Sequence, residues 1–192
     1  TRRSHLAGAR PGRPGGPPAR RCHLGHGGAV HQVGVEIDPD ILSAAYRYFH
    51  LADAGVTPVV QDGRYWLATD HHKYDVIVMD AYRQPYIPFH LTTREFFQQA
   101  KDHLKPGGVA VVNAGRTRSD FRLVGAVAST MAAVYPSVYL VDVPQFSNTL
   151  VYAPTDPTTT TDIAHTLQLS EAATRNQGTA RGTADRNGAP PP

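Results

Sequence analysis

Short apolar runs alternate with amphipathic segments along the middle of the chain. The runs are rich in Val and Ile, as expected of buried strands, and lie at 33–36, 56–61, 74–79 and 109–112. Helical spacing of apolar residues predicts helices over 38–51, 63–69, 92–104 and 118–135. Two further runs, 138–143 and 149–152, are separated by a short connection and predict an antiparallel hairpin. This order is typical of an α/β, Rossmann-like, doubly wound fold with a mostly parallel sheet.

Local signals mark several element ends. Asp38 followed by Pro39 predicts an N-cap and a first helical residue, because proline lacks the N–H that this position leaves unused. Thr92 and Glu95 have the spacing of a capping box at the start of the third helix. The Lys-Pro-Gly-Gly segment at 105–108 predicts the end of that helix before the next strand.

The two ends of the chain differ in composition from its middle. Residues 1–32 are crowded with Arg, Gly, Pro and Ala, and residues 154–192 with Thr, Ala, Gly, Asn and Pro. Neither end carries enough apolar surface to offset the entropy of ordering it, so both are predicted to be disordered. The sequence therefore predicts one folded domain over 33–153, of ordinary domain size.

Charge is distributed as unevenly as hydrophobicity. The 192-residue chain has a net charge of +3, but residues 1–32 alone carry six Arg and no acid. A basic segment without interleaved aromatics is predicted to be solvated, so neither nucleic acid nor membrane is expected as a partner. The single cysteine, Cys22, rules out an internal disulfide. The sequence offers no apolar run of membrane-spanning length and no signal-peptide core, which predicts a cytoplasmic protein.

Three acids each follow an apolar run. They are Glu36, Asp62 and Asp80, and in a parallel sheet they would meet at the carboxyl ends of the strands, where ligands bind. Each also has an ordinary structural explanation. Glu36 could face water or cap a helix, Asp62 could be the N-cap of the helix beginning at Gly63, and Asp80 could be paired or solvated.

Metal and hydrolase chemistry have little support in the sequence. His71 and His72 are adjacent in a polar turn, where neighbouring side chains do not converge on one ion, and no cysteine or carboxylate cluster accompanies them. The serines lack the strand–turn–helix context of a nucleophile elbow. No metal site is therefore predicted.

Four segments together resemble a known family. They are 36–39 (Glu-Ile-Asp-Pro), 61–63 (Gln-Asp-Gly), 74–80 (Tyr-Asp-Val-Ile-Val-Met-Asp) and 104–108 (Leu-Lys-Pro-Gly-Gly). Their order and spacing are similar to those of the spermidine synthase-like (polyamine aminopropyltransferase) family over about 33–153. The resemblance implies the class I methyltransferase fold and aminopropyl transfer from decarboxylated S-adenosylmethionine to a small amine, in polyamine biosynthesis. It also implies a possible homodimer.

The resemblance assigns roles to the acids. Glu36 would bind the ribose hydroxyls of the nucleoside, and Asp62, with the backbone of Gly63, would bind the adenine amino group. Glycine suits that place because a backbone without Cβ can approach a flat base. Asp80 would be the catalytic base, which is needed because an ammonium must lose a proton before its nitrogen can attack.

Two positions depart from the family pattern. Arg83 stands where the family has a second acid that holds the amine, and Phe146 stands where a tyrosine is expected in the substrate loop. Both are predicted substrate-binding positions, and both changes point away from putrescine as the acceptor. Two alternatives stay open: a methyltransferase that uses intact S-adenosylmethionine, with Arg83 pairing its carboxylate, or a non-catalytic remnant.

The start of the fold is incomplete in the sequence. Residues 24–28 (Leu-Gly-His-Gly-Gly) resemble the Gly-rich turn that follows the first strand of this fold, yet only residues 29–35 separate them from Glu36. Seven residues cannot hold both a helix and the next strand. The first strand and the helix of the Gly-rich loop are therefore expected to be missing from an N-terminally truncated chain, with the glycine cluster as a linker.

Overall fold

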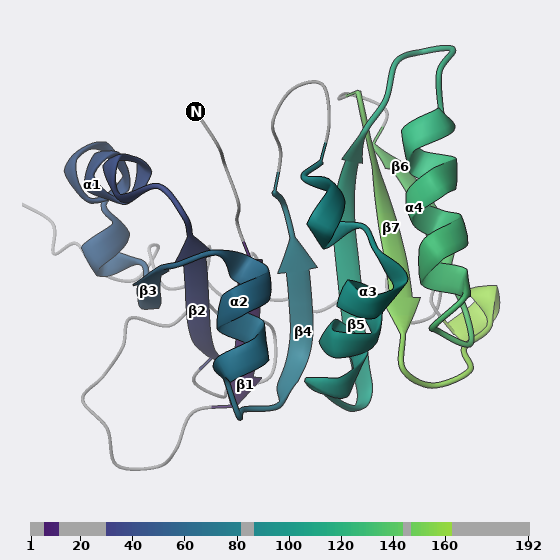
Figure 1. The fold of residues 1–192 in the computed structure, drawn as a ribbon, viewed down its shortest axis with the longest axis horizontal. Helices are drawn as coiled ribbons and strands as arrows, with labels where there is room; N and C mark the ends of the chain where they lie inside the picture. The colour runs from purple at the N-terminus through teal and green to yellow at the C-terminus, as the bar shows by residue number, and fades with distance from the viewer. Residues whose placement is uncertain (1–5, 12–29, 82–86, 144–146, 163–192) are drawn as a thin grey trace, which may run out of the picture. The chain divides into compact units, whose positions relative to one another are not determined.

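A seven-stranded sheet forms the centre of the computed structural model, which describes residues 6–11, 30–81, 87–143 and 147–162 (Figure 1). The spatial order is β3-β2-β1-β4-β5-β7-β6. The strands are β1 (Leu6–Pro11), β2 (Val30–Glu36), β3 (Val56–Val60), β4 (Tyr74–Met79), β5 (Leu104–Gly115), β6 (Tyr139–Val143) and β7 (Asn148–Pro154). The helices are α1 (Pro39–Tyr48), η1 (Leu51–Asp53), α2 (Gly63–Thr69), η2 (Phe89–Leu91), α3 (Arg94–Asp102) and α4 (Arg122–Ala132).

The sheet is mixed: five of its seven described strands point the same way, as the predicted mostly parallel sheet requires, whereas two of the six strand pairs are parallel. β2 pairs in parallel with β3, and β4 pairs in parallel with β5. β1 is antiparallel to both β2 and β4, so those two strands point the same way. β7 is antiparallel to β5 and to β6, which confirms the predicted terminal hairpin. Of the described strands, β1 and β7 alone oppose the common direction.

The centre of the sheet differs from expectation in one respect. The sequence predicts no strand before residue 33, yet Leu6–Pro11 forms β1, and β2 begins at Val30. Among the described residues, the strand between β2 and β4 is antiparallel to both, and the first helix begins at Pro39. An extended segment fills the gap, because β2 and β4 would otherwise face each other with unpaired backbone groups.

The core lies between the sheet and a row of helices. α2, α3 and α4 lie side by side over one face (Figure 1), with α2 in contact with α3 and α3 with α4, whereas α1 contacts β2 and β3. Alternate residues of the strands are buried under that row, as period-two patterning requires. The buried strand and helix residues include Ile77, Met79, Ala110, Val112, Val151, Phe96, Phe97, Val127 and Met131. A large apolar side chain buried in this way contributes about 1.5–3 kcal/mol.

Two of the four predicted helix starts are confirmed, the start of α3 is wrong by a residue, and α4 runs from Arg122 to Ala132 within the predicted range 118–135. Asp38 caps α1 by accepting from the Asp40 N–H at 2.9 Å, with Pro39 in the first turn. The predicted capping box beginning at Thr92 is incorrect, because the N-cap of α3 is Thr93, which accepts from the Phe96 N–H at 3.2 Å. Thr92 instead donates to the carbonyl of the preceding 3-10 turn, and two adjacent threonines leave the sequence pattern ambiguous.

The fifth strand begins earlier than predicted. Residues 105–108 were expected to separate a helix from a strand at 109, but β5 runs from Leu104 to Gly115. Its pairing with β4 shifts register between Tyr74 and Val76, and Gly107 has a φ of 75°, a value that favours glycine. The glycines that the sequence pattern interprets as a helix stop therefore lie in the irregular first residues of β5.

Among the described helices, none has the length and apolar character that crossing a membrane requires.

Residues 158–162 belong to a separate unit. In it, the Asp162 carboxylate accepts from the Thr159 N–H at 2.9 Å and from the Thr159 hydroxyl at 2.7 Å.

Replacing Gly108 with alanine should destabilise the fold. A Cβ there would stand 2.8 Å from the Lys105 carbonyl oxygen and 3.2 Å from that of Asp75, and backbone atoms cannot move aside cheaply. We expect a loss of about 1–3 kcal/mol in the free energy of unfolding, measured by urea denaturation. Gly125→Ala is the matched control, since nothing lies within 4 Å of its Cβ, and alanine in a helix should be neutral or stabilising by up to about 1 kcal/mol. Equal effects of the two changes would contradict this account.

The stability of the fold should depend on Asp70 in acid. Burial alone would raise the pKa of Asp70, but the hydrogen bond from Tyr74 and the hydrogen bond and charge of His72 outweigh it, so the pKa lies below its ordinary value. A lowered folded-state pKa gives stability that is complete above the unfolded value, near 3.9, and is lost as pH falls through the folded one.

Asp70→Asn keeps an acceptor for Tyr74 but cannot titrate. We therefore expect its free energy of unfolding to fall less than that of the parent between about pH 5 and pH 3, measured by urea denaturation at each pH. Parallel curves for the two proteins would show that Asp70 makes no such contribution.

Candidate functional site

The register of the sheet brings two of the predicted acids to the same edge. Leu6 of β1 pairs with Val35 on one side and with Met79 on the other. Glu36 and Asp80, the next residues of β2 and β4, therefore stand at the same level. Strands are spaced about 4.8 Å apart, so two spacings put these backbones about 10 Å from each other. The carboxyl ends of β2, β3 and β4 thus meet at one edge of the sheet, at the pointed ends of the β2 and β4 arrows (Figure 1).

Glu36 is buried at the end of β2. Its residue is 1% exposed, and Oε1 accepts from the Asp38 N–H at 2.9 Å. Glu36 does not itself cap α1, since Asp38 is the N-cap, but its carboxylate holds the backbone of that capping residue. A buried carboxylate is costly unless hydrogen bonds support it, so this acid is fixed in place rather than loosely solvated.

Both carboxylate oxygens of Asp62 have hydrogen-bond partners. Oδ1 accepts from the N–H groups of Arg64 and Tyr65, each at 3.0 Å, which makes Asp62 the N-cap of α2, and Gly63 is the buried first residue of that helix. Oδ2 lies 3.1 Å from Nε2 of His90. Because a carboxylate only accepts, Nε2 must carry the hydrogen. The capping alternative is thus realised together with a contact that the sequence did not predict.

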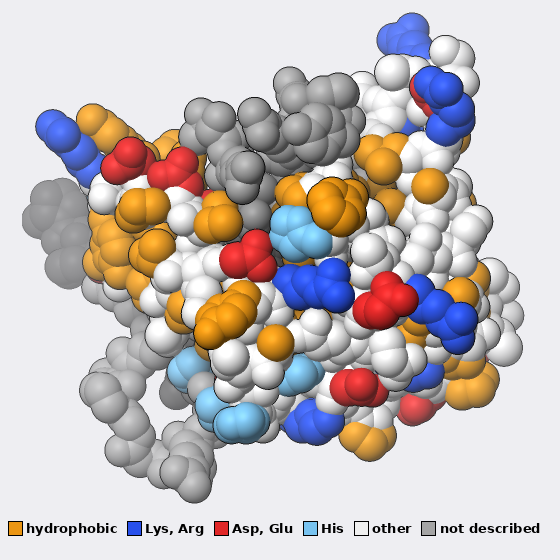
Figure 2. Space-filling model, viewed as in Figure 1, with side chains coloured by type: hydrophobic (Ala, Val, Ile, Leu, Met, Phe, Trp, Pro, Cys, Tyr) orange, Lys and Arg blue, Asp and Glu red, His pale blue; other side chains and the backbone are white. Residues whose placement is uncertain are grey.

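His90 reaches Asp62 because a short turn is held beside α2. Nη1 of Arg64 donates to the His90 carbonyl at 2.9 Å and lies 3.5 Å from the Thr93 hydroxyl, which ties η2 to the start of α2. Figure 2 shows acidic, basic and histidine side chains next to one another on the face that α2 and α3 form. A lone histidine in a Pro-rich loop gives no sequence signal for this role.

Asp80 is exposed and lies at the end of a chain of side-chain amides. Its Oδ1 accepts from Nδ2 of Asn113 at 3.0 Å, and Oδ1 of Asn113 accepts from Nδ2 of Asn148 at 3.0 Å. The three residues come from the ends of β4 and β5 and from the first residue of β7. Sequence analysis missed both asparagines. The available signal was a polar residue at 113 directly after the apolar run 109–112.

Two predicted substrate residues lie outside the described part of the chain. Arg83 falls within 82–86 and Phe146 within 144–146, so their roles stay predictions. In the described residues, no group of three or more His, Cys, Asp or Glu side chains could hold a metal ion.

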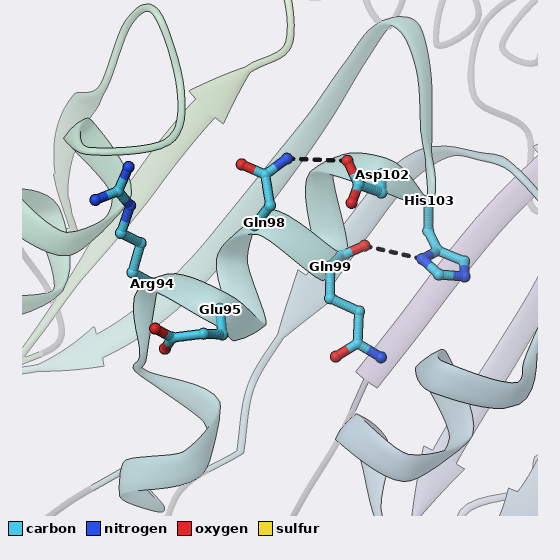
Figure 3. Close-up of a pocket in the computed structure, with 6 residues that line it drawn as sticks. All are labelled: Arg94, Glu95, Gln98, Gln99, Asp102 and His103. Carbon is cyan, nitrogen blue, oxygen red and sulfur yellow. Dashed lines mark hydrogen bonds between the residues drawn. The ribbon is translucent and has the colours of Figure 1, made fainter.

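A pocket along α3 lies apart from this edge. Figure 3 shows its lining, with the Gln98 amide bonded to Asp102 at 2.9 Å and the His103 ring bonded to the Gln99 carbonyl at 2.8 Å. The other ring nitrogen of His103 meets the Asp70 carbonyl at 2.9 Å. These groups satisfy one another at the end of α3 that leads into the start of β5. The pocket therefore belongs to the packing of α3 and not to the acidic edge. Its lining residues are Arg94, Glu95, Gln98, Gln99, Asp102 and His103.

Comparison with known proteins gives relatives of one kind. The probable polyamine aminopropyl transferase of Bifidobacterium longum is 42% identical over 125 residues, which cover 63% of this chain and 28% of the relative. The polyamine aminopropyltransferase of Vibrio vulnificus is 36% identical over 125 residues, which cover 63% of this chain and 41% of the relative. The chain therefore spans less than half the length of these curated relatives.

The fold has a similar solved structure outside the aminopropyltransferases. Human methyltransferase-like protein 13, in complex with SAH, superposes with a TM-score of 0.64 at 25% identity, covering 74% of this chain and 70% of that one. The α/β class I methyltransferase-like fold expected from the sequence is thereby confirmed.

The family itself follows from a match across most of the described domain. The model of the spermine/spermidine synthase domain family matches residues 25–161, which is more than half of the 192 residues and includes all three acids. On this match and the curated relatives, the chain belongs to the spermine/spermidine synthase family.

Proposed function

We propose that this chain is the catalytic domain of an aminopropyltransferase, which moves the aminopropyl group of decarboxylated S-adenosylmethionine to a small amine. One observation carries the proposal: β2, β3 and β4 run in the same direction to one edge of the sheet. At that edge β2 ends in Glu36, β3 is followed by Asp62, and β4 is followed by Asp80. All of the groups to be bound there donate hydrogen bonds or carry positive charge: ribose hydroxyls, an adenine amino group, ammonium groups and a sulfonium. Carboxylates are acceptors only, so the two sets are complementary.

The nucleoside would be held by Glu36 and Asp62. Glu36, at the end of β2, would accept from the ribose diol, and Asp62 with the backbone of Gly63 would take the adenine amino group. The cap of α2 and His90 occupy part of Asp62, yet a carboxylate has about four lone-pair sites, which leaves capacity for one more donor. Gly63, the buried first residue of α2, directly follows Asp62, so its backbone would stand next to that carboxylate.

Asp80 would act on the amine. Its exposure suits a group that must meet a diffusing substrate, whereas Glu36 is buried. Asp80 takes a proton from the substrate ammonium, and the freed nitrogen lone pair attacks the carbon next to the sulfonium. The new C–N bond forms as the C–S bond breaks. The electron pair of the C–S bond stays on the sulfur, which becomes a neutral thioether.

The reactants are small polar molecules. We therefore also propose a cytoplasmic location, with neither nucleic acid nor membrane as partner.

A methyltransferase is the second candidate. The similarity to a methyltransferase-like protein bound to SAH favours it, as does Arg83, whose guanidinium suits the carboxylate that intact S-adenosylmethionine retains. The two candidates differ in the charge of the cofactor tail, so the choice between them can be measured directly.

Asp80→Asn should slow transfer strongly while sparing donor binding. Loss of the base should lower kcat about 10²–10⁴-fold, measured by product formation from decarboxylated S-adenosylmethionine and a panel of diamines. Asp75→Asn is the matched control, because Asp75 lies at the opposite end of β4 and pairs with Lys105 at 2.8 Å. Its activity should stay within about two-fold of the parent, like an ordinary surface ion-pair change. Full activity of Asp80→Asn would remove Asp80 from the mechanism.

Cofactor preference separates the two candidates. We expect calorimetric titration of the full chain to give at least about ten-fold tighter binding of decarboxylated than of intact S-adenosylmethionine, because an added carboxylate would meet an acidic edge, a difference of about 1.4 kcal/mol. Tighter binding of the intact form would favour the methyltransferase. Absence of binding by either form, in a chain that unfolds cooperatively, would contradict both.

A further inference from the structure

We propose that Asn113 is a positioning residue for the Asp80 carboxylate and that Asn148 in turn fixes the amide of Asn113. The inference rests on the proposed function, since it concerns how the candidate base is aimed at an amine. It adds two residues, from β5 and β7, to a site otherwise built from β2, β3 and β4.

The sheet register brings these three side chains together. Met79 of β4 pairs with Val112 of β5, so the next residues, Asp80 and Asn113, are neighbours across the parallel pair. Asn113 stands opposite Leu150 in β7, and Asn148 lies two residues away from that partner. Residues in this diagonal relation share one face of a sheet and are within reach of each other.

That face is the one turned away from α3 and α4. The neighbours of Asn113 along β5, Val112 and Ala114, are buried under the helices at 1% and 0% exposure. Since side chains alternate, Asn113 projects to the opposite side, and so does Asp80 relative to the buried Met79. The amide chain therefore lies on the opposite face of the sheet from α3 and α4, and Asp80 at its end is exposed.

The chemistry of the groups fixes the direction of every hydrogen bond. A carboxylate accepts only, so Asn113 must turn its Nδ2 toward Asp80, and its Oδ1 is then the acceptor for Nδ2 of Asn148. If Asn148 were lost, the Asn113 amide would gain freedom to rotate away from Asp80. With both in place, Oδ1 of Asp80 is held at 3.0 Å from Nδ2 of Asn113, while no described residue donates to Oδ2, the oxygen that would take the proton.

The nearby charged groups are engaged elsewhere. Arg116, just beyond β5, donates to the Thr149 hydroxyl at 3.0 Å and lies 3.3 Å from Asp142. Glu36 is two strands away from Asp80 across β1. Among the described residues, Asp80 is thus hydrogen-bonded to a neutral amide, which orients the carboxylate without pairing it with a positive charge.

Alanine substitutions test the positioning. Asn113→Ala should lower kcat about 10- to 100-fold, as expected for a misplaced reacting group, with the KM for the nucleoside donor within about two-fold. Asn148→Ala should give a smaller loss, since Asn113 remains. Gln98→Ala is the matched control, because it removes a primary amide that donates to a carboxylate at 2.9 Å on the remote surface of α3, and it should leave kcat unchanged.

Asn113→Asp gives a readout that a merely structural role would not move. Two carboxylates about 3 Å apart resist ionising together, so the acid limb of the kcat pH profile should move to higher pH. An Asn113→Ala enzyme with parental kcat, or an Asn113→Asp profile that superposes on the parent's, would overturn the proposal.

NMR of the full chain separates this proposal from the function itself. The carbon-13 chemical shift of the Asp80 carboxyl should change in Asn113→Ala, because the hydrogen bond to Oδ1 is lost, and should stay at the parental value in Gln98→Ala. A parent that transfers no aminopropyl group would refute the proposed function, while the changed Asp80 signal would still support the contact. An unchanged Asp80 signal in Asn113→Ala would refute the contact whatever the activity.

Discussion

The backbone pairing of β1 with two strands at once is the constraint on which the site depends. β2 and β3 lie on one side of β1, and β4, β5, β7 and β6 lie on the other. Glu36 and Asp62 belong to the first group, and Asp80 with its two asparagines belongs to the second. The hydrogen bonds of Leu6–Pro11 therefore set both the spacing and the level of the acids. A slip of one residue along either neighbour would turn every side chain on that strand to the other face.

The three acids differ in how firmly the fold holds them. Glu36 is buried and bonded to the backbone that caps α1, and Asp62 is divided between the cap of α2 and His90. Asp80 is exposed and held at one oxygen by a neutral amide. This order, from fixed to accessible, fits a site in which recognition of a nucleoside needs rigid acceptors and proton transfer needs an oxygen that a substrate can reach.

Sequence patterns were sufficient where local chemistry decides structure. The nearly continuous apolar run 74–79 is β4, Asp62 followed by Gly63 begins α2, and Asp38 with Pro39 begins α1. The strand Leu6–Pro11 could not be predicted, because Leu-Ala-Gly-Ala-Arg-Pro lacks the alternation of apolar and polar residues. It is a strand because its backbone pairs with β2 and β4. Among the described site residues, the acids were visible at the ends of strands, but His90, Asn113 and Asn148 were not. Their partners are distant in sequence, and register is a property of the assembled sheet.

The hairpin of β6 and β7 also has a consequence for how this family can vary. Asn148 opens β7 directly after the connection from β6, and its side chain reaches toward β4 through Asn113. Adding or deleting one residue in that connection, if it displaced β7 against β5, would present Ser147 or Thr149 in place of the amide. The length of this connection between two strands is thereby tied to the proposed proton acceptor, Asp80, two strands away.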